Sequence, residues 1–425
     1  MKIVQQINLE SAQVSSESAT FELLNERIYW DPANYTGIVG IYFQVNTKYI
    51  WGAAEGEIEL YDITNSQTIA TVTINEENWT RHLSADIQAS LTEAKILGLR
   101  MKRTSGSDFN APATLSASLI VIQDDSTASR KTAMYYVGFN YYETSSFASW
   151  ASNSAYQFIP KISDCDGTVK VTIEAYLKAA SGGQAMLRLY DLTTAEAVSG
   201  SEVTTNETSY IRAESGELTL NSSHKYTFQC KSGVNGKYAY IATPVLKIVC
   251  SGFNKVASLC IVSGLGTNEA ASGWSDFTSK EYFFRGYIDG TDSLTFGLGL
   301  CWYNYVAGHN EWNQRLYNIT AAEAVTGTTE AKAIDTSQAD IDYLTPTMPP
   351  DYSEIVGQAD SAALDSLGPF YIYAFQQENL PSTPNFPADP TQPTGYHCFM
   401  SQFIRNMLAG YIPLLTPDGV NKCWS

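Results

Sequence analysis

One short phrase occurs three times in this chain, and its spacing constrains the fold more than any other feature of the sequence. The copies read EIELYDITNSQTIAT, MLRLYDLTTAEAVSG and NQRLYNITAAEAVTG, and they cover Glu57–Thr71, Met186–Gly200 and Asn313–Gly327. The central tyrosines, Tyr61, Tyr190 and Tyr317, follow one another at an interval of about 128 residues, which is the size of a whole domain. Solenoid repeats are shorter, at about 20 to 50 residues. The chain is therefore predicted to contain three related domains in tandem.

The phrase itself predicts a β-hairpin. In the middle copy, Leu189 and Tyr190 alternate between the two faces of a strand. Asp191 can then bond its own backbone and start a turn, and Val198 begins the returning strand. Another strand is predicted upstream, where alternate residues share one apolar face: Val169, Val171, Ile173, Ala175 and Leu177.

Composition and turn signals favour an all-β fold. Only 16% of the 425 residues are charged, whereas 12% are aromatic, and this balance is typical of sheets rather than helices. We expect three tandem antiparallel β-sandwich domains of jelly-roll-like topology. They are predicted at 1–126, 127–252 and 253–380. The third is divergent, because the segment after Thr326 lacks the strand pattern of the other two.

The C-terminal segment, 381–425, is predicted to be a Pro-rich arm followed by an apolar anchor. Pro381–Pro393 contains five prolines and favours an extended conformation. Beyond it, five apolar residues suit one face of a short helix: Phe399, Phe403, Met407, Leu408 and Tyr411. This anchor either folds back on the third domain or docks on another subunit, and the sequence favours the second arrangement.

The middle copy also resembles a known kind of module. The stretch LRLYDLTTAEAVSGSEVTTNETSYIRAESGELTL, Leu187–Leu220, is similar to modules that recur in structural proteins of tailed-phage virions, and Gln314–Gly327 matches over a shorter length. The resemblance implies a non-enzymatic capsid decoration, head-fibre or tail-associated protein that assembles in the host cytoplasm. Its partners would be other virion proteins, and a homo-oligomer is expected. The pattern is also similar to sandwich modules that bind carbohydrate.

Charge and composition exclude several other classes. The formal net charge is −18, and no basic stripe is present, so nucleic acid is not an expected partner. No long apolar run and no secretory signal occur, so membrane insertion and export are not expected. The seven cysteines show no metal-binding spacing and are expected to be mostly reduced thiols.

No catalytic pattern stands out. The four histidines lie outside metal-binding motifs, so neither a metal nor a cofactor is expected. A carbohydrate-binding adhesin or receptor-binding fibre is the alternative function, and a polysaccharide-cleaving enzyme is a third. The possible glycan-binding residues are the aromatics Trp302, Tyr303, Tyr305 and Trp312. The other interpretation of these aromatics is packing in the core or at a domain junction.

Overall fold

The computed structural model describes most of the chain up to residue 375, with gaps. The described residues are 2–10, 14–50, 55–77, 80–106, 111–124, 131–137, 141–144, 148–152, 158–160, 162, 165, 167–251, 256–262, 271–283, 295–303, 312–319, 321–332, 339–344, 347, 353–361 and 366–375. The predicted arm and the anchor residues Phe399, Phe403, Met407, Leu408 and Tyr411 lie outside them, as does Tyr305. Trp302, Tyr303 and Trp312 lie in strands whose side chains at these positions are not described.

The first lobe (lobe 1) is a sandwich of two antiparallel sheets. One sheet has the order β1 (Lys2–Glu10), β9 (Ala111–Asp124), β4 (Ile38–Ile50) and β7 (Thr80–Leu83), and β2 (Val14–Ser15) also pairs with β9. The other has the order β3 (Glu22–Trp30), β8 (Lys95–Arg103), β5 (Gly56–Asp62) and β6 (Gln67–Ile74). Two short 3-10 turns, η1 (Pro32–Asn34) and η2 (Gln88–Ser90), also belong to this lobe.

Lobe 2 repeats this plan. Its inner sheet has the order β10 (Lys131–Val137), β19 (Ala239–Ser251), β13 (Thr168–Ala179) and β17 (Ile211–Glu214), with β11 (Tyr141–Thr144) also on β19. Its outer sheet has the order β12 (Ala151–Ser152), β18 (Tyr226–Ser232), β14 (Ala185–Asp191) and β15 (Glu196–Ala197), with β16 (Val203–Thr205) also on β14.

Lobe 3 follows the same order with its own strands. The inner sheet runs β20 (Val256–Val262), β28 (Ser366–Phe375), β22 (Thr295–Tyr303) and β26 (Ala339–Leu344). The outer sheet runs β21 (Ala271–Phe283), β27 (Ser353–Ser361), β23 (Trp312–Asn318) and β24 (Glu323–Ala324), with β25 (Glu330–Lys332) also on β23.

The strand order is that of a jelly roll. When the eight principal strands of each lobe are counted along the chain, one sheet has the order 1-8-3-6 and the other 2-7-4-5. This double-sheet arrangement of two Greek keys defines the jelly roll. The prediction of an all-β chain with three jelly-roll-like sandwiches is therefore confirmed, whereas the exact domain boundaries stay a prediction.

The third copy is more regular than its sequence indicates. The segment after Thr326 is predicted to lack the strand pattern of the other two copies, but it forms β26 and β27, and β27 pairs with β23. The apolar run at Pro369–Phe375, which itself predicts a strand, lies in β28. The strand at Ser353–Ser361 was hidden because its sequence, SEIVGQADS, carries few apolar residues.

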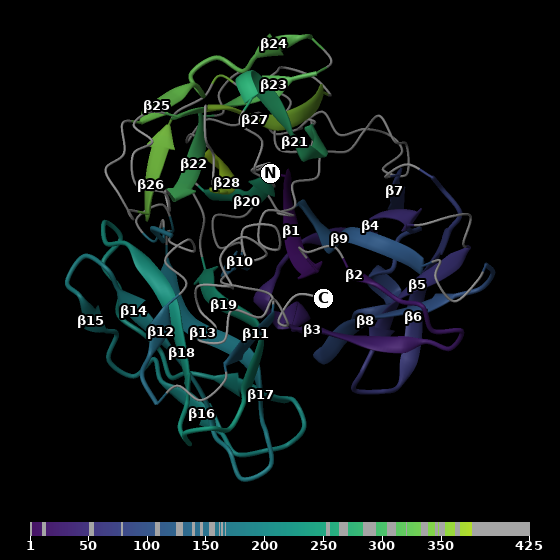
Figure 1. The fold of residues 1–425 in the computed structure, drawn as a ribbon, viewed down its shortest axis with the longest axis vertical. Coiled ribbons are helices and arrows are strands. Elements are labelled where there is room, and N and C mark those ends of the chain that lie inside the picture. The colour runs from purple at the N-terminus through teal and green to yellow at the C-terminus, as the bar shows by residue number, and fades with distance from the viewer. Residues whose placement is uncertain are drawn as a thin grey trace.

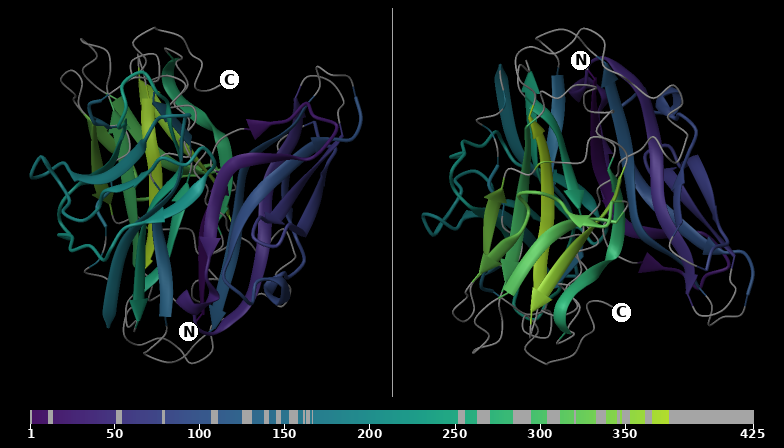
Figure 2. Two further views of the ribbon diagram at one scale, coloured as in Figure 1. Left: turned by 90° about the horizontal axis from the view of Figure 1, so that it is seen from below. Right: turned by 90° about the horizontal axis from the view of Figure 1, so that it is seen from above.

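The three lobes lie around a common centre (Figure 1). The sheets that contain β1, β10 and β20 face this centre, and the sheets that contain β5, β14 and β23 lie outside (Figure 1). Figure 2 shows that many strands run roughly along the shortest axis of the body, which is the viewing direction of Figure 1. Contacts of β20 with β1 and β10, and of β19 with β3, join the lobes. One chain thus forms an approximately threefold body.

The repeated phrase forms the same hairpin in each lobe. Tyr61, Tyr190 and Tyr317 lie in β5, β14 and β23, the fourth principal strand of each lobe. The following Asp62, Asp191 or Asn318 accepts a hydrogen bond from a turn amide at 3.0, 3.1 and 3.1 Å. A residue with positive φ then closes each turn: Ser66 (56°), Ala195 (57°) and Ala322 (55°).

A buried hydroxyl completes the hairpin in lobes 2 and 3. Gly200 has a φ of 78°, and it turns the chain so that Ser201, which is fully buried, accepts from the Leu189 amide at 3.0 Å. The same hydroxyl donates to the carbonyl of Val198 at 2.7 Å. Thr328 makes equivalent bonds in lobe 3. In lobe 1, β6 instead continues as one strand through this position.

We predict that Ser201→Ala lowers the free energy of unfolding by about 1 to 3 kcal/mol, because it leaves the buried Leu189 amide without a partner. Ser199→Ala, an exposed change two residues away, is the matched control and should change stability by less than about 0.5 kcal/mol. Urea unfolding measures both. Equal stabilities of the two variants would contradict this role for the Ser201 hydroxyl.

Candidate binding cavity between lobes 1 and 2

Lobes 1 and 2 meet along a seam that is fastened at both ends. At one end, the amide of Arg27 in β3 donates to Thr243 Oγ1 at 3.1 Å. The guanidinium of Arg27 also lies 4.6 Å from the centre of the Tyr210 ring. Burial lowers the pKa of Arg27, although the nearby Tyr210 and Glu26 oppose this shift. This end therefore combines a backbone hydrogen bond with a cation–π contact.

At the other end, backbone groups of the two lobes bond directly. The amide of Thr36 donates to the carbonyl of Lys131 at 3.0 Å, and the amide of Lys131 donates to Thr36 Oγ1 at 2.9 Å. Gln123 Nε2 donates to the carbonyl of Thr36 at 2.7 Å and to the carbonyl of Lys131 at 2.9 Å. Thr132 Oγ1 in turn donates to Gln123 Oε1 at 2.8 Å. Gln123 and Thr132 are fully buried, so these bonds are shielded from water.

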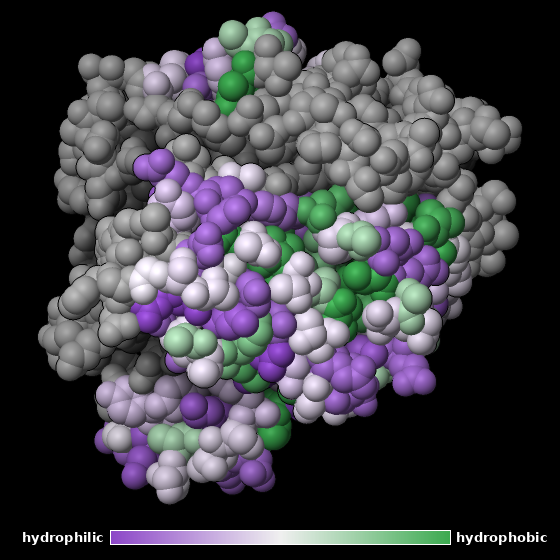
Figure 3. Space-filling model, turned by 90° about the vertical axis from the view of Figure 1, so that its right-hand side faces the viewer, coloured by the Kyte–Doolittle hydropathy of each residue, from purple (hydrophilic) through white to green (hydrophobic). Residues whose placement is uncertain are grey.

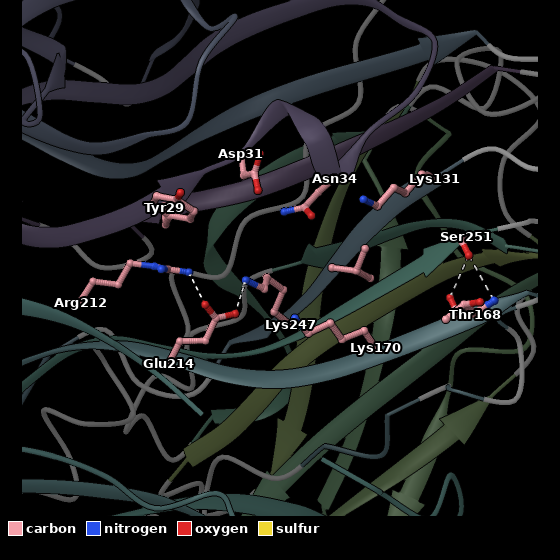
Figure 4. Close-up of a pocket in the computed structure, with 11 residues that line it drawn as sticks. Tyr29, Asp31, Asn34, Lys131, Thr168, Lys170, Arg212, Glu214, Lys247 and Ser251 are labelled. Atoms are coloured by element: carbon pink, nitrogen blue, oxygen red, sulfur yellow. Dashed lines mark hydrogen bonds and ion pairs between the residues drawn. The ribbon is translucent and has the colours of Figure 1, made fainter. Parts of the chain in front are cut away.

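A cavity of about 390 Å³ lies between these two ends. Its roof comes from the end of β3 and from η1, and its floor comes from β13, β17 and β19 of the inner sheet of lobe 2 (Figure 4). The lining residues are Tyr29, Asp31, Asn34, Lys131, Thr168, Lys170, Arg212, Glu214, Lys247, Val249 and Ser251.

The floor is charged because of strand alternation. In β13 the core face carries Val171, Ile173 and Ala175, so Lys170 and Glu174 point to the opposite face, toward lobe 1. There Glu174 Oε2 pairs with Arg212 Nη2 at 2.7 Å and with Lys247 Nζ at 3.2 Å. Glu214 joins the same two cations at 2.7 Å each. The four groups balance to zero charge.

The network is held in place from both sides. The side chains of Glu174 and Lys247 are only 5% and 8% exposed, so their pairing is needed to offset desolvation. Tyr29 of lobe 1 covers the guanidinium of Arg212, with 3.8 Å between the guanidinium carbon and the ring centre. The Thr172 hydroxyl donates to Glu214 Oε1 at 3.1 Å.

The pairing shifts the titration of these groups. Burial opposes the charge of Arg212, but the hydrogen bond and charge of Glu174, with the charge of Glu214, raise the pKa of the guanidinium. Burial also opposes the charge of Glu214, which by itself would raise the pKa of this carboxylate. Interactions with Lys247, Arg212 and Thr172 outweigh burial and lower the pKa of Glu214 below its ordinary value. Arg212 and Glu214 thus both remain charged at neutral pH.

The two ends of the cavity differ in charge. The end near Lys131 and Lys170 carries two ammonium groups, and among the described residues neither has an acidic partner. The opposite end carries the carboxylates of Asp31 and Glu214 beside the Tyr29 ring (Figure 4). Asp31 also accepts from the amide of Ala33 at 2.9 Å, which fixes its position on the roof. The cavity can therefore bind an anionic group at one end and hydrogen-bond donors at the other.

The three repeat-defining tyrosines lie away from this cavity, on the outer sheets. Each lies near an arginine of the same lobe, with 3.7, 5.7 and 5.2 Å from the guanidinium carbon to the ring centre. A second aromatic ring also lies near each arginine. The three sets are Phe21–Arg100–Tyr61, Trp150–Arg188–Tyr190 and Trp274–Arg315–Tyr317. The side of lobe 1 that includes its outer sheet mixes polar and apolar residues (Figure 3).

Sequence reasoning did not identify the cavity. Lys170 and Glu174 alternate with apolar residues in a strand, and this pattern is also typical of a face in water. The predicted glycan-binding aromatics belong to the third repeat, and their side chains lie outside the described residues. Cys230 and Cys250 are buried, and Cys165 is partly buried. Among the described residues, no group of three or more His, Cys, Asp or Glu side chains could hold a metal ion.

No protein-family model matches this chain. No curated protein matches it. Within the described part, no helix has the length and hydrophobicity that crossing a bilayer requires.

Solved structures show only a distant likeness. The tandem CBM22-1-CBM22-2 domain of Paenibacillus barcinonensis Xyn10C is 13% identical and covers 58% of this chain and 92% of its own, with a TM-score of 0.19. VP2 in the infectious bursal disease virus subviral particle is 8% identical, with 93% and 84% covered and a TM-score of 0.18. N-glycanase F is 9% identical, with 60% and 96% covered and a TM-score of 0.19. Such low scores carry no functional argument.

We predict that Glu174→Gln destabilises the protein far more than Glu214→Gln does. The first change removes the buried acceptor of two cations and should cost about 3 kcal/mol. The second removes a more exposed carboxylate, so it should cost about 1 kcal/mol or less. Urea unfolding at neutral pH measures both. Similar losses for the two variants would contradict a central role for Glu174.

We also predict that the effect of Glu214→Gln depends on pH. Because the folded pKa of Glu214 lies below the ordinary 4.5, its contribution is fully present above that value and is lost as pH falls through the folded pKa. The stability difference from the natural protein should therefore shrink as pH falls below 4.5 and disappear once pH lies below the folded pKa. Glu217→Gln, an exposed change nearby, is the control. A difference that persists in acid would contradict the assignment.

Proposed function

We propose that this chain is a non-enzymatic structural protein of a virion, such as a capsid decoration, head-fibre or tail-associated protein of a tailed phage. The observation that carries the proposal is the ring of three jelly rolls within one chain. Repetition of a whole domain multiplies contact surfaces on a rigid body. An active site, in contrast, needs unlike residues that converge at one place.

The threefold body suits attachment to an assembly. Most protein assemblies are symmetric, and a body with three related sides can sit on a threefold axis or replace a trimer there. The chain also has a formal charge of −18, which keeps a protein soluble at high local copy number. Jelly rolls occur in both capsid proteins and lectins, so the fold class alone does not decide between these roles.

The C-terminal segment is the proposed attachment device. Its five prolines would hold residues 381–393 extended, and the apolar residues that follow would dock on a partner subunit of the particle. At the polyproline rise, thirteen residues reach about 40 Å. The rigid body would then stand away from the surface to which the anchor binds.

Truncation after Leu380 tests this role. The full chain should sediment with assembled particles in a density gradient, and the truncated chain should remain mostly free while lobes 1 and 2 stay folded. Failure of the full chain to sediment with particles would overturn the virion assignment. Full occupancy by the truncated chain would overturn the anchor alone.

A matched pair of substitutions separates the anchor from the arm. Replacing Phe399, Phe403 and Met407 with alanine keeps the arm and removes the apolar face, so particle attachment should fall. Ser401→Ala with Asn406→Ala changes neighbouring polar positions and should leave attachment unchanged. Equal behaviour of the two sets would show that the apolar face is not the anchor.

Carbohydrate binding is the second candidate function, because aromatic rings are exposed at one end of the inner sheet of lobe 2. Tyr238 is 43% exposed and lies 6.3 Å from Tyr240, ring centre to ring centre. The Lys178 ammonium lies 4.5 Å from the centre of the Tyr240 ring. Such a platform can stack on a sugar ring. Binding to a glycan array that is lost in Tyr238→Ala would support carbohydrate binding. No binding to the array would contradict it.

A further inference from the structure

Three charged residues at the cavity, Lys170, Glu174 and Lys247, have uncharged counterparts in lobe 1. Equivalent positions in lobe 1 follow from strand pairing, since Ile173 faces Leu246 in lobe 2 and Phe43 faces Leu119 in lobe 1. By this register Glu174 corresponds to Gln44, Lys247 to Ile120 and Lys170 to Gly40. Arg212, in contrast, corresponds to Arg81. The jelly-roll framework therefore does not require the charges of Lys170, Glu174 and Lys247, and their presence in lobe 2 needs another explanation.

The ion network supplies a fixed floor, because Glu174, Arg212, Glu214 and Lys247 bind one another. Lys131 and Lys170 are then the cations of the lining that have no acidic partner among the described residues. The chain as a whole is strongly acidic, so its overall field does not attract anions. An anion that binds here must be recognised by local contacts, and two ammonium groups at one end supply them.

The other end has the opposite preference. Asp31 on the roof and Glu214 on the floor are acceptors, and Asn34, which lies between Asp31 and Lys131, can both donate and accept (Figure 4). A bare anion such as phosphate would meet these carboxylates unfavourably. A molecule with hydroxyl groups at one end and a carboxylate at the other would match both ends.

We propose that the cavity between lobes 1 and 2 binds a polyhydroxylated carboxylate of the sugar-acid class. Its carboxylate would pair with Lys131 and Lys170, and its hydroxyls would donate to Asp31 and Glu214. The volume of about 390 Å³ lies near the lower end of ligand pockets and suits one or two sugar rings. Sites of this kind occur preferentially where domains meet. The inference is separate from the virion role, since either can fail while the other holds.

Calorimetric titration of the full chain tests the proposal with four probes: D-glucuronate, N-acetylneuraminate, D-glucose and inorganic phosphate. At least one of the two sugar acids should bind, and both glucose and phosphate should bind at least about tenfold more weakly, a difference of about 1.4 kcal/mol. No measurable binding of either acid at millimolar concentration overturns the proposal. Equally tight binding of glucose or of phosphate also overturns it. The first result would show that the carboxylate is not recognised, and the second that the sugar hydroxyls are not recognised.

Variants locate the site. Lys131→Met with Lys170→Met should weaken binding of the sugar acid at least about tenfold, whereas Lys237→Met, an exposed change elsewhere in lobe 2, should not. Asp31→Asn should weaken binding of the sugar acid but not of acetate, which lacks hydroxyls. Unchanged melting temperatures verify folding. Equal loss in the Lys237 control, or no loss in the double variant, overturns the assignment.

Two sources could supply this chemistry, a free sugar acid or the terminal residue of a glycan. A trisaccharide that ends in the same acid distinguishes them in the same titration. Tighter binding of the trisaccharide identifies a glycan terminus, and tighter binding of the monosaccharide identifies a free acid. Both results support the proposal, provided that the lysine variants reduce them.

Discussion

Each lobe depends on the turn that follows the tyrosine of the repeated phrase. In a sheet the side chains alternate with a period of two, so a slip of one residue would exchange the buried and exposed faces. The turn prevents this slip, because a side-chain oxygen accepts from a turn amide and a residue with positive φ closes the hairpin. As a result the residues before the three tyrosines are fully buried in every lobe: Leu60, Leu189 and Leu316.

Local features of the sequence predicted much of this fold. The turn residues, the alternating strand at Thr168–Ala179 and the interval between copies depend on near neighbours, so the hairpins and the number of lobes could be predicted. The threefold arrangement depends on contacts between lobes, for which the sequence has no comparable signal. The strand at Ser353–Ser361 in the late part of lobe 3 was missed because its sequence carries few apolar residues, although it pairs with both β21 and β23.

The candidate cavity could not be predicted for a related reason. Glu174 and Lys247 lie 73 residues apart, and their partner Arg212 belongs to a third strand. In the sequence each is one charged residue in an alternating pattern, as on any solvated sheet face. They become buried only because β3 and η1 of lobe 1 lie over this face. Burial by another lobe changes a solvated charge into one that must be paired.

The short connection between lobes 1 and 2 explains how so polar a seam can exist. Strand β9 ends at Asp124 and β10 begins at Lys131, so the two lobes cannot diffuse apart. Short tethers give effective concentrations in the millimolar range or above. Free subunits would need a large, dry and mainly apolar interface to associate as firmly. Because lobes 1 and 2 are joined covalently, their interface need not be large and apolar. It can therefore retain charged residues and an open cavity.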